Sequence, residues 1–492
     1  MFKNITKKFN ILRPVLAILI LFIPLYPKFP LSTVKNTYVA IRLDDIIISV
    51  SILIWAILQI KKRLPVFKNP LFKLFLIYFA GIFLSTLHAI LILKTTPVNL
   101  LILHFLRRIE YMLVAFVAID AVQSKKDLKY PFFFLIIASI FVALYGYGQK
   151  YFNWPIISTM NEEFSKGYIL NLTKWSRISA AFAGHYDLAA FLSVILVLIL
   201  GITLKSKKSL LKIPILIIWL ILFQLLVFTV SRISIFAFWG GAIFMLLFIK
   251  KKIWIIPVSL LVILNLFKSD QLNDRLVATI QTLKPKPTVT VILPSPSPQP
   301  TLKLKISPIP TPKSKTTPIP TIFRHPTPPE YPEVDIDAGV SRSGEIRFNV
   351  EWPRALNAFY KNPLLGTGLG SITLATDNDY LRLLGESGIF GFLSFFIILF
   401  WFFIHSLKKN QNYLIYIFLA CLLTTLANAI FIDVFEASKT AYLFWIMIGI
   451  YYKILKFYSR HPDHPQGEKN LGTKCRIINA NARSFTHVQD DE

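Results

Sequence analysis

Twelve apolar runs follow one another along the chain, and polar connections separate them. Lipid offers no hydrogen-bond partners to a backbone, so an apolar run that crosses a bilayer must be a helix. Most of these runs are close to the roughly 20 residues that span the hydrocarbon core. We therefore predict transmembrane helices at 11–30, 43–60, 71–93, 98–122, 131–148, 187–204, 211–230, 232–249, 253–267, 388–405, 412–432 and 437–455.

Two of these runs depart from the pattern. The run 253–267 is short, and the run 98–122 contains Arg107, Arg108 and Glu110. Charges inside a membrane are costly, so these three residues are expected to form an internal ion pair or to mark the true end of that helix.

Composition excludes both a soluble globular protein and a disordered one. The chain of 492 residues is 54% hydrophobic and 14% aromatic, and only 16% is charged, against roughly a quarter in soluble domains. A nucleic-acid partner is not expected, because the net charge of +28 has to be divided between the two membrane faces first. Cys421 lies in an apolar run and Cys475 in the C-terminal tail, so we expect neither a disulfide nor a zinc site.

The division of charge between alternate connections predicts the orientation. The short connections after the second, fourth, sixth, eighth and tenth runs carry 17 Lys and Arg, whereas those on the other side carry six. The positive-inside rule then places both termini in the cytoplasm of an inner-membrane protein. The first run lacks a small-residue cleavage site after it and is expected to be retained as a span.

This orientation predicts the organisation of the chain. A bundle of nine spans (1–267, with an outward segment at 149–186) precedes an extracytoplasmic loop (268–387), further membrane helices (388–455) and a cytoplasmic tail (456–492). Within the loop, 15 of the 30 prolines fall in 285–332. That insert is expected to be an extended or disordered spacer, or alternatively a wall-contacting or O-glycosylated stalk.

Polar residues at the predicted outer face are the candidates for chemistry. Asp377, Asn378 and Asp379 stand at the outer lip of a span, where Asp377 is either a proton acceptor or a plain helix cap. Arg347 and Arg232 share that face, and an arginine fork suits a diphosphate. Thr376 and Asp379 have the spacing of a capping box.

Other outward residues are candidates for substrate binding. Arg177 and His185 precede the sixth run, Trp352 begins an expected helix, and Tyr380 follows Asp379. The glycines of GTGLG at 366–370 lack the Lys-Ser/Thr of a phosphate-binding loop, so they predict a turn that packs closely against another segment. The outward acid pairs have common chance spacings, so we expect neither a metal nor another cofactor.

Five segments, taken in order, resemble the bacterial O-antigen ligase and O-antigen polymerase family of integral membrane glycosyltransferases. They are RISAAFAGHYDLAAFL at 177–192, SRISIFAFWGG at 231–241, Arg347 with Trp352, Ala355 and Leu356, PLLGTGLG at 363–370, and DNDYLRLLGESGIFG at 377–391. The resemblance implies an all-α polytopic membrane protein of about twelve transmembrane helices with a large external loop.

The resemblance also implies an activity. Members pass a glycan from undecaprenyl diphosphate to an acceptor hydroxyl at the outer membrane face, with inversion and without a nucleotide sugar. Their essential external arginines map onto Arg232 and Arg347, whereas ligases of the family often have His where this chain has Asp377. The expected partners are a lipid-linked oligosaccharide, a lipid, glycan or protein acceptor, and membrane lipids.

The residues leave alternatives open. The catalytic group expected beside Arg232 and Arg347 is Asp377 or, failing that, His185 or Asp379. A transporter of an anion or a lipid-linked sugar is a second hypothesis, although no clear internal repeat supports it. A third is a non-enzymatic anchor that displays the Pro-rich arm.

Overall fold

The computed structural model describes nine segments of the chain: residues 10–27, 29–33, 40–94, 96–156, 177–206, 210–268, 346–372, 376–407 and 412–458. The predictions for the Pro-rich insert and for residues 459–492 therefore lie outside the described residues.

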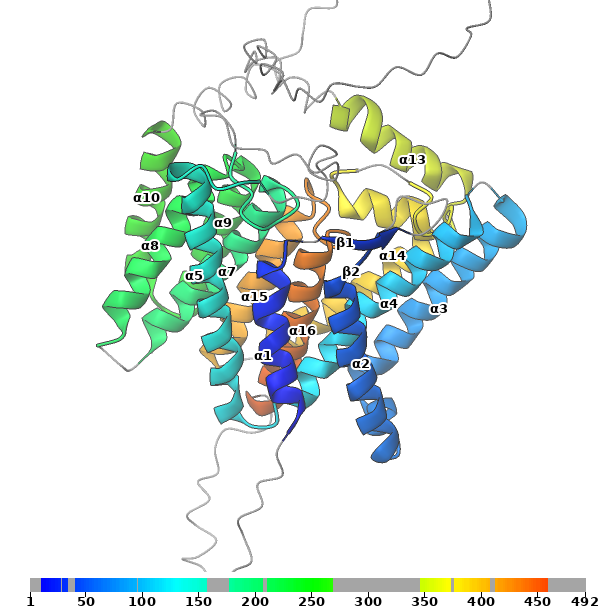
Figure 1. Cartoon of the computed structure of the whole chain (residues 1–492), viewed down its shortest axis with the longest axis horizontal. Coiled ribbons are helices and arrows are strands. Elements are labelled where there is room, and N and C mark those ends of the chain that lie inside the picture. Colours follow the sequence, from blue (N-terminus) through cyan, green and yellow to red (C-terminus); the bar gives the residue numbers. More distant parts are fainter. Residues whose placement is uncertain are drawn as a thin grey trace, which may run out of the picture.

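Each of the twelve apolar runs forms a helix, as predicted, and the helices stand together in a bundle (Figure 1). They are α1 (Leu12–Leu25), α2 (Leu43–Lys61), α3 (Pro70–His88), α4 (Val98–Ala121), α5 (Lys129–Tyr151), α7 (His185–Lys205), α8 (Lys212–Phe228), α9 (Arg232–Phe248), α10 (Ile255–Lys268), α14 (Asp379–Ser406), α15 (Tyr413–Asn428) and α16 (Ser438–Tyr458). Five helical segments are long and apolar enough to cross a membrane: Leu43–Lys61, Pro70–Leu93, Lys125–Tyr151, His185–Lys205 and Asp379–Ser406.

Shorter elements connect and cover the bundle. The helix α13 (Trp352–Lys361) starts at Trp352, as expected, and lies across one end of the bundle beside α14 (Figure 1). Single turns occur at η1 (Pro65–Lys68), η2 (Ala89–Leu93), η3 (Lys125–Leu128), η4 (Lys252–Trp254) and η5 (Arg347–Glu351).

The first helix is shorter than expected, and the described chain is not purely helical. α1 ends at Leu25, and a small antiparallel hairpin of β1 (Pro30–Thr33) and β2 (Ala40–Arg42) follows it. Pro27 comes two residues after the helix end, where a proline without an N–H cannot continue the helix.

The helix α4 runs unbroken through its charged residues, so these do not mark its end, and their partners lie on other elements. Arg107 approaches Asp45 of α2 at 3.8 Å, and Arg108 forms an ion pair with Glu436 in the loop before α16. Glu110 accepts a hydrogen bond of 2.8 Å from Ser49. The two arginines therefore form internal ion pairs, but with acidic residues that neighbouring elements supply.

The first and last described residues of the chain, Asn10 and Tyr458, lie at the same end of the bundle. The amide of Asn10, before α1, donates to the Asp120 carbonyl at 2.8 Å, near the end of α4. The Lys125 ammonium, just beyond α4, stands 4.4 Å from the ring of Tyr458 at the end of α16. The first and last helices thus reach the same end of the bundle.

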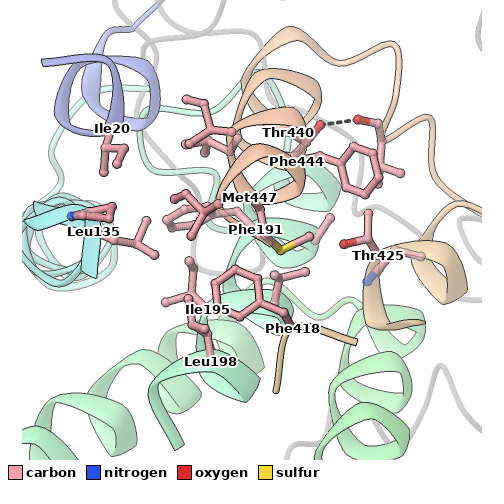
Figure 2. A pocket seen from close by; sticks show the side chains of 18 of the residues that line it. Ile20, Leu135, Phe191, Ile195, Leu198, Phe418, Thr425, Thr440, Phe444 and Met447 are labelled. Atoms are coloured by element: carbon pink, nitrogen blue, oxygen red, sulfur yellow. Dashed lines mark hydrogen bonds between the residues drawn. The ribbon is translucent and has the colours of Figure 1, made fainter. Parts of the chain in front are cut away.

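An apolar cavity of about 80 Å³ lies inside the bundle between α1, α5, α7, α15 and α16 (Figure 2). Ile20, Phe191, Phe418 and Met447 point into it, and Thr425 is among the few polar residues in its wall. Its volume is small, so most of the bundle interior is filled by side chains.

Candidate active site

An ion pair joins the turn before α13 to the residue before α14. The guanidinium of Arg347, on η5, donates to one oxygen of Asp377, with Nε–Oδ2 at 2.9 Å and Nη2–Oδ2 at 2.7 Å. The Arg347 side chain is 11% exposed and that of Asp377 is 29% exposed. The pair therefore lies at the edge of the protein interior, with Asp377 the more accessible partner.

Three arginines gather around Tyr186, in the first turn of α7. The Arg347 guanidinium carbon is 5.5 Å from the centre of that ring, and the Arg177 carbon is 6.0 Å from it. Arg232, the first residue of α9, lies close enough to interact electrostatically with Tyr186, Arg177 and Arg347. The structure thus brings together three sequence-predicted site residues that are up to 170 positions apart in the chain.

His185 belongs to the same cluster through Arg177. The two side chains meet at 2.6 Å, between Nη1 of Arg177 and Nε2 of His185. A guanidinium only donates hydrogen bonds, so the ring nitrogen that faces it must be the accepting, unprotonated one. This contact occupies the lone pair that His185 would need to take a proton through Nε2.

Asp377 is held in place by its neighbours and is not a helix cap. The cap of α14 is Asn378, whose side chain accepts from the Leu381 N–H at 2.9 Å, so the capping box expected from Thr376 and Asp379 is wrong. Asp377 itself has a positive φ of 49°, a conformation that aspartate adopts more readily than most residues. This turn directs its carboxylate away from the helix end and towards Arg347.

A carboxylate from a distant loop clamps this turn. Asp433, between α15 and α16, accepts the N–H of Thr376 at 3.1 Å and that of Asn378 at 3.2 Å. It also pairs with Arg382 on α14 at 3.2 Å. The residues on either side of Asp377 are thereby fixed relative to the rest of the bundle.

Two of the predicted substrate-binding residues use their polar atoms within the protein. Asp379 is buried and accepts the Phe435 N–H at 3.0 Å, and the Tyr380 hydroxyl donates to the Leu426 carbonyl at 2.6 Å. Trp352 stacks edge-on against Phe348 at 4.8 Å, and its buried indole N–H has no hydrogen-bond partner within the described residues.

Glu351 completes the cluster, one helical turn after Arg347. One of its carboxylate oxygens is buried and lacks a hydrogen-bond partner among the described residues. Burial, together with the nearby charge of Asp377, raises the pKa of Glu351 to about 7, although Arg347 acts in the opposite direction. Burial also raises the pKa of Asp377, against the effect of Arg347.

A chain of buried hydrogen bonds supports Arg232. Ser231 donates to Ser234 at 3.1 Å, Ser234 donates to Asn428 at 2.7 Å, and Asn428 donates to Ser193 at 3.0 Å. These bonds link α9, α15 and α7. They fix the start of α9, and with it the backbone position of Arg232.

The glycine-rich turn packs closely against its neighbours, as predicted. Gly366, Gly368 and Gly370 all have positive φ, and a side chain at Gly368 would meet Ala89 and Leu101. The Gly368 N–H also donates to the Glu386 carbonyl at 2.9 Å. The turn thus packs the segment after α13 against η2, α4 and α14.

Comparison with protein families identifies a stretch that contains four residues of this cluster. A family model described as O-antigen ligase matches residues 217–396. Residues 217–396 are therefore similar to the O-antigen ligase family. No curated protein matches the chain.

The O-antigen ligase match and the apolar helices indicate a multi-pass membrane protein of surface polysaccharide biosynthesis, with glycosyltransferase-like ligase or polymerase chemistry. Arg232, Arg347, Glu351 and Asp377 lie within the matched stretch. Arg177, His185, Tyr186 and Asp433 lie outside it, although the fold brings them to the same place. Among the residues that the structure describes, no three His, Cys, Asp or Glu are arranged to hold a metal.

Three members of the cluster around Arg347 were not predicted from the sequence. Tyr186 was adjacent to His185 in a segment already singled out, Glu351 directly preceded Trp352, and Asp433 lay between the last two apolar runs. Adjacency to a predicted site residue was the available signal for Tyr186 and Glu351, and Asp433 had no such signal. Only the folded contacts distinguish these three from other outward polar residues.

Proposed function

We propose that this protein transfers a glycan from a polyprenyl diphosphate, such as undecaprenyl diphosphate, to an acceptor hydroxyl. The acceptor oxygen bonds to the anomeric carbon while the bond from that carbon to the diphosphate oxygen breaks. The diphosphate leaves with the electron pair, and the acceptor proton passes to a carboxylate. One displacement of this kind inverts the anomeric carbon and needs no metal.

The arginine cluster is the observation that carries this proposal. Arg177 and Arg347 lie close enough to repel the charge of Arg232, and Asp377 supplies one carboxylate against these three guanidinium groups. Two phosphates in this cluster would offset the repulsion. Guanidinium groups at the diphosphate would also stabilise the charge that develops as it leaves.

The contacts favour two carboxylates over the other candidate bases. His185 engages Arg177 through Nε2, and Asp379 is buried against the Phe435 N–H. Asp377 and Glu351, by contrast, stand beside Arg347 at the edge of the bundle. We assign proton transfer to this pair, with Glu351 the better matched to neutral pH because its pKa is about 7.

An apolar groove beside Tyr380 offers a place for the carrier tail. An apolar groove of about 360 Å³ runs between α14 and α15, and it is lined by Leu393, Phe396, Ile397, Leu399, Phe400, Phe403, Leu422, Leu423 and Leu426. Its walls reach Tyr380, which contacts both Leu426 and Phe396. The internal cavity of about 80 Å³ is much too small for a long isoprenoid, so the groove is the better site.

Replacing Arg347 tests the proposal. In cells that lack the wild-type gene, Arg347→Ala should abolish the surface glycan and cause its lipid-linked precursor to accumulate. Loss of one charge-stabilising donor typically lowers turnover about 100-fold or more. The measurements are the glycan profile and the amount of lipid-linked precursor.

Lys361→Ala provides the matched control, because Lys361 is an exposed cation at the far end of α13. That variant should keep wild-type levels of both the glycan and the precursor. Membrane levels of the two variants should be equal. Wild-type glycan and precursor levels in Arg347→Ala cells would refute the proposed role of the arginine cluster.

A further inference from the structure

A second, polar pocket lies at the end of the bundle opposite the candidate active site. α14 and α16 both start beside that site and contribute residues near their other ends to this pocket. Its volume is about 480 Å³, and it is lined by Gln59, Pro65, Val66, Lys68, Asn69, Pro70, Phe116, Ile119, Asp120, Trp401, His405, Tyr452, Lys453, Leu455 and Lys456.

The charge of this pocket is positive. Lys68, Lys453 and Lys456 line it, and none of the three forms an ion pair within the part of the chain that the structure describes. The one carboxylate in the lining is Asp120. Its Oδ2 already accepts hydrogen bonds from the Trp55 indole, at 2.8 Å, and from the Gln59 amide. Asp120 also acts electrostatically on Lys453, so three ammonium groups stand against one carboxylate in the pocket wall.

Aromatic rings form one wall of the pocket. Trp401 stacks on His405 with ring centres 4.1 Å apart, and on Tyr452 at 5.7 Å. Such amphipathic rings are typical of the depth at which lipid head groups meet the acyl chains. Phe116, Ile119 and Leu455 supply an apolar wall next to the lysines. The pocket thus combines cations at its mouth with apolar surface in its depth.

The surroundings of the pocket place it at the membrane surface. Lys68 and Lys456 are exposed, and so are two apolar side chains beside them: Leu64, just before η1, is 41% exposed and Phe67, within η1, is 50% exposed. Large apolar side chains are stable at such a position when acyl chains cover them. A soluble anion would satisfy the lysines but would leave this apolar rim in water.

We propose that this pocket binds an anionic phospholipid, with the phosphate held by Lys68, Lys453 and Lys456 and the acyl chains along the adjoining apolar surface. Basic pockets between membrane helices recognise lipid phosphates through this combination of charge and apolar contact. The site is separate from the arginine cluster, and the proposal does not depend on the glycan-transfer reaction.

Lipid binding to the purified, delipidated full chain tests this inference. Phosphatidylglycerol should raise the melting temperature, whereas phosphatidylcholine with the same acyl chains should have little effect. Lys68→Gln and Lys456→Gln should each weaken the apparent affinity for phosphatidylglycerol about 5-fold, because one lysine near a lipid surface contributes about 1 kcal/mol. Both residues are exposed, so the variants should melt like the wild type without lipid.

The variant Lys61→Gln/Lys62→Gln is the matched control, because these exposed lysines end α2 nearby but do not line the pocket. It should bind phosphatidylglycerol as the wild type does. A separate arm with glycerol phosphate distinguishes a soluble phosphate from a lipid. Equal stabilisation by phosphatidylcholine or by glycerol phosphate, or unchanged affinity in Lys68→Gln and Lys456→Gln, would overturn the inference.

Discussion

At the scale of single residues, the environment of each carboxylate decides its chemistry. Asp377 is bound by two N–H groups of Arg347, whereas Glu351 keeps a buried oxygen without a partner among the described residues. Arg354 and Asp433 are the further charged groups that act on Glu351, in opposite directions. A carboxylate in these surroundings is half ionised near neutral pH, where a proton acceptor works best.

The pH dependence of transfer separates the two carboxylates. Glu351 accepts a proton only when ionised, and its pKa is about 7, so wild-type turnover should rise with pH and level off above about 7. Glu351→Gln should remove this rise and lower turnover about 100-fold or more. Initial rates measured from pH 5.5 to 9, with the donor in proteoliposomes, give both quantities.

Asp377→Asn is the comparison variant for this experiment. If Glu351 accepts the proton, Asp377→Asn should retain a rise with pH even though its turnover falls. If Glu351→Gln retained the rise near pH 7 while Asp377→Asn lost it, proton transfer would belong to Asp377 instead.

At the scale of elements, the bend of α14 connects the candidate site to the bundle. Gly388 has a φ of 63° inside this helix, and its N-terminal half carries Asp379, Tyr380 and Arg382. The Ile389 N–H donates to the Pro363 carbonyl at 2.9 Å, and this bond joins the bend to the segment after α13. The bend thus sets how the start of α14 approaches Arg347.

Substituting Gly388 tests the importance of this bend. In Gly388→Ala, the new methyl group would overlap the carbonyl of Leu364, and the positive φ would be strained. We expect a loss of about 2 kcal/mol or more in stability, seen as a lower melting temperature in detergent. Gly240→Ala, in α9, is the control, because nothing lies within 4 Å of the added carbon. Equal melting of Gly388→Ala and wild type would show that the bend is not required.

Most helices, but not every element, could be predicted from the sequence. Length and hydropathy were enough to predict a helix for every apolar run, because lipid leaves the backbone no alternative. The apolar run 388–405 covers only the later part of α14, which begins at Asp379, because the charged residues of its first turns lower the hydropathy there. Hydropathy also gave no sign of the β1–β2 hairpin, whose strands have only three or four residues.

The candidate site could be predicted only in part, because some of its residues are defined by contacts between distant segments. Arg232 was chosen because a charge between two apolar runs is costly unless it faces water or an anion. Arg347 was chosen because it shares the predicted outer face and because the family resemblance implies an essential arginine there, and the fold brings the two together. Tyr186 and Asp433 act through contacts between segments that are far apart in sequence. No local pattern encodes those contacts, so they became visible only when the helices were packed.

At the scale of the whole molecule, the two ends of the bundle carry different candidate sites. The candidate active site occupies the end where α7, α9, α14 and α16 begin, and the lysine-lined pocket occupies the other. The described ends of the chain, at Asn10 and Tyr458, lie at this second end. This arrangement agrees with both termini lying on one side of the membrane, and the positive-inside rule predicts that this side is the cytoplasm.

Thiol labelling in intact cells tests the predicted orientation. Cys421 and Cys475 are first replaced by serine, and single cysteines are then introduced as Lys361→Cys on α13 and Lys62→Cys after α2, both at exposed positions. A membrane-impermeant thiol reagent should label Lys361→Cys directly, because we expect α13 to face outward. It should label Lys62→Cys only after the membrane is permeabilised, because the cation-rich connections are expected to remain in the cytoplasm. The reverse pattern would place the arginine cluster in the cytoplasm, where a carrier that presents its glycan outside could not reach it.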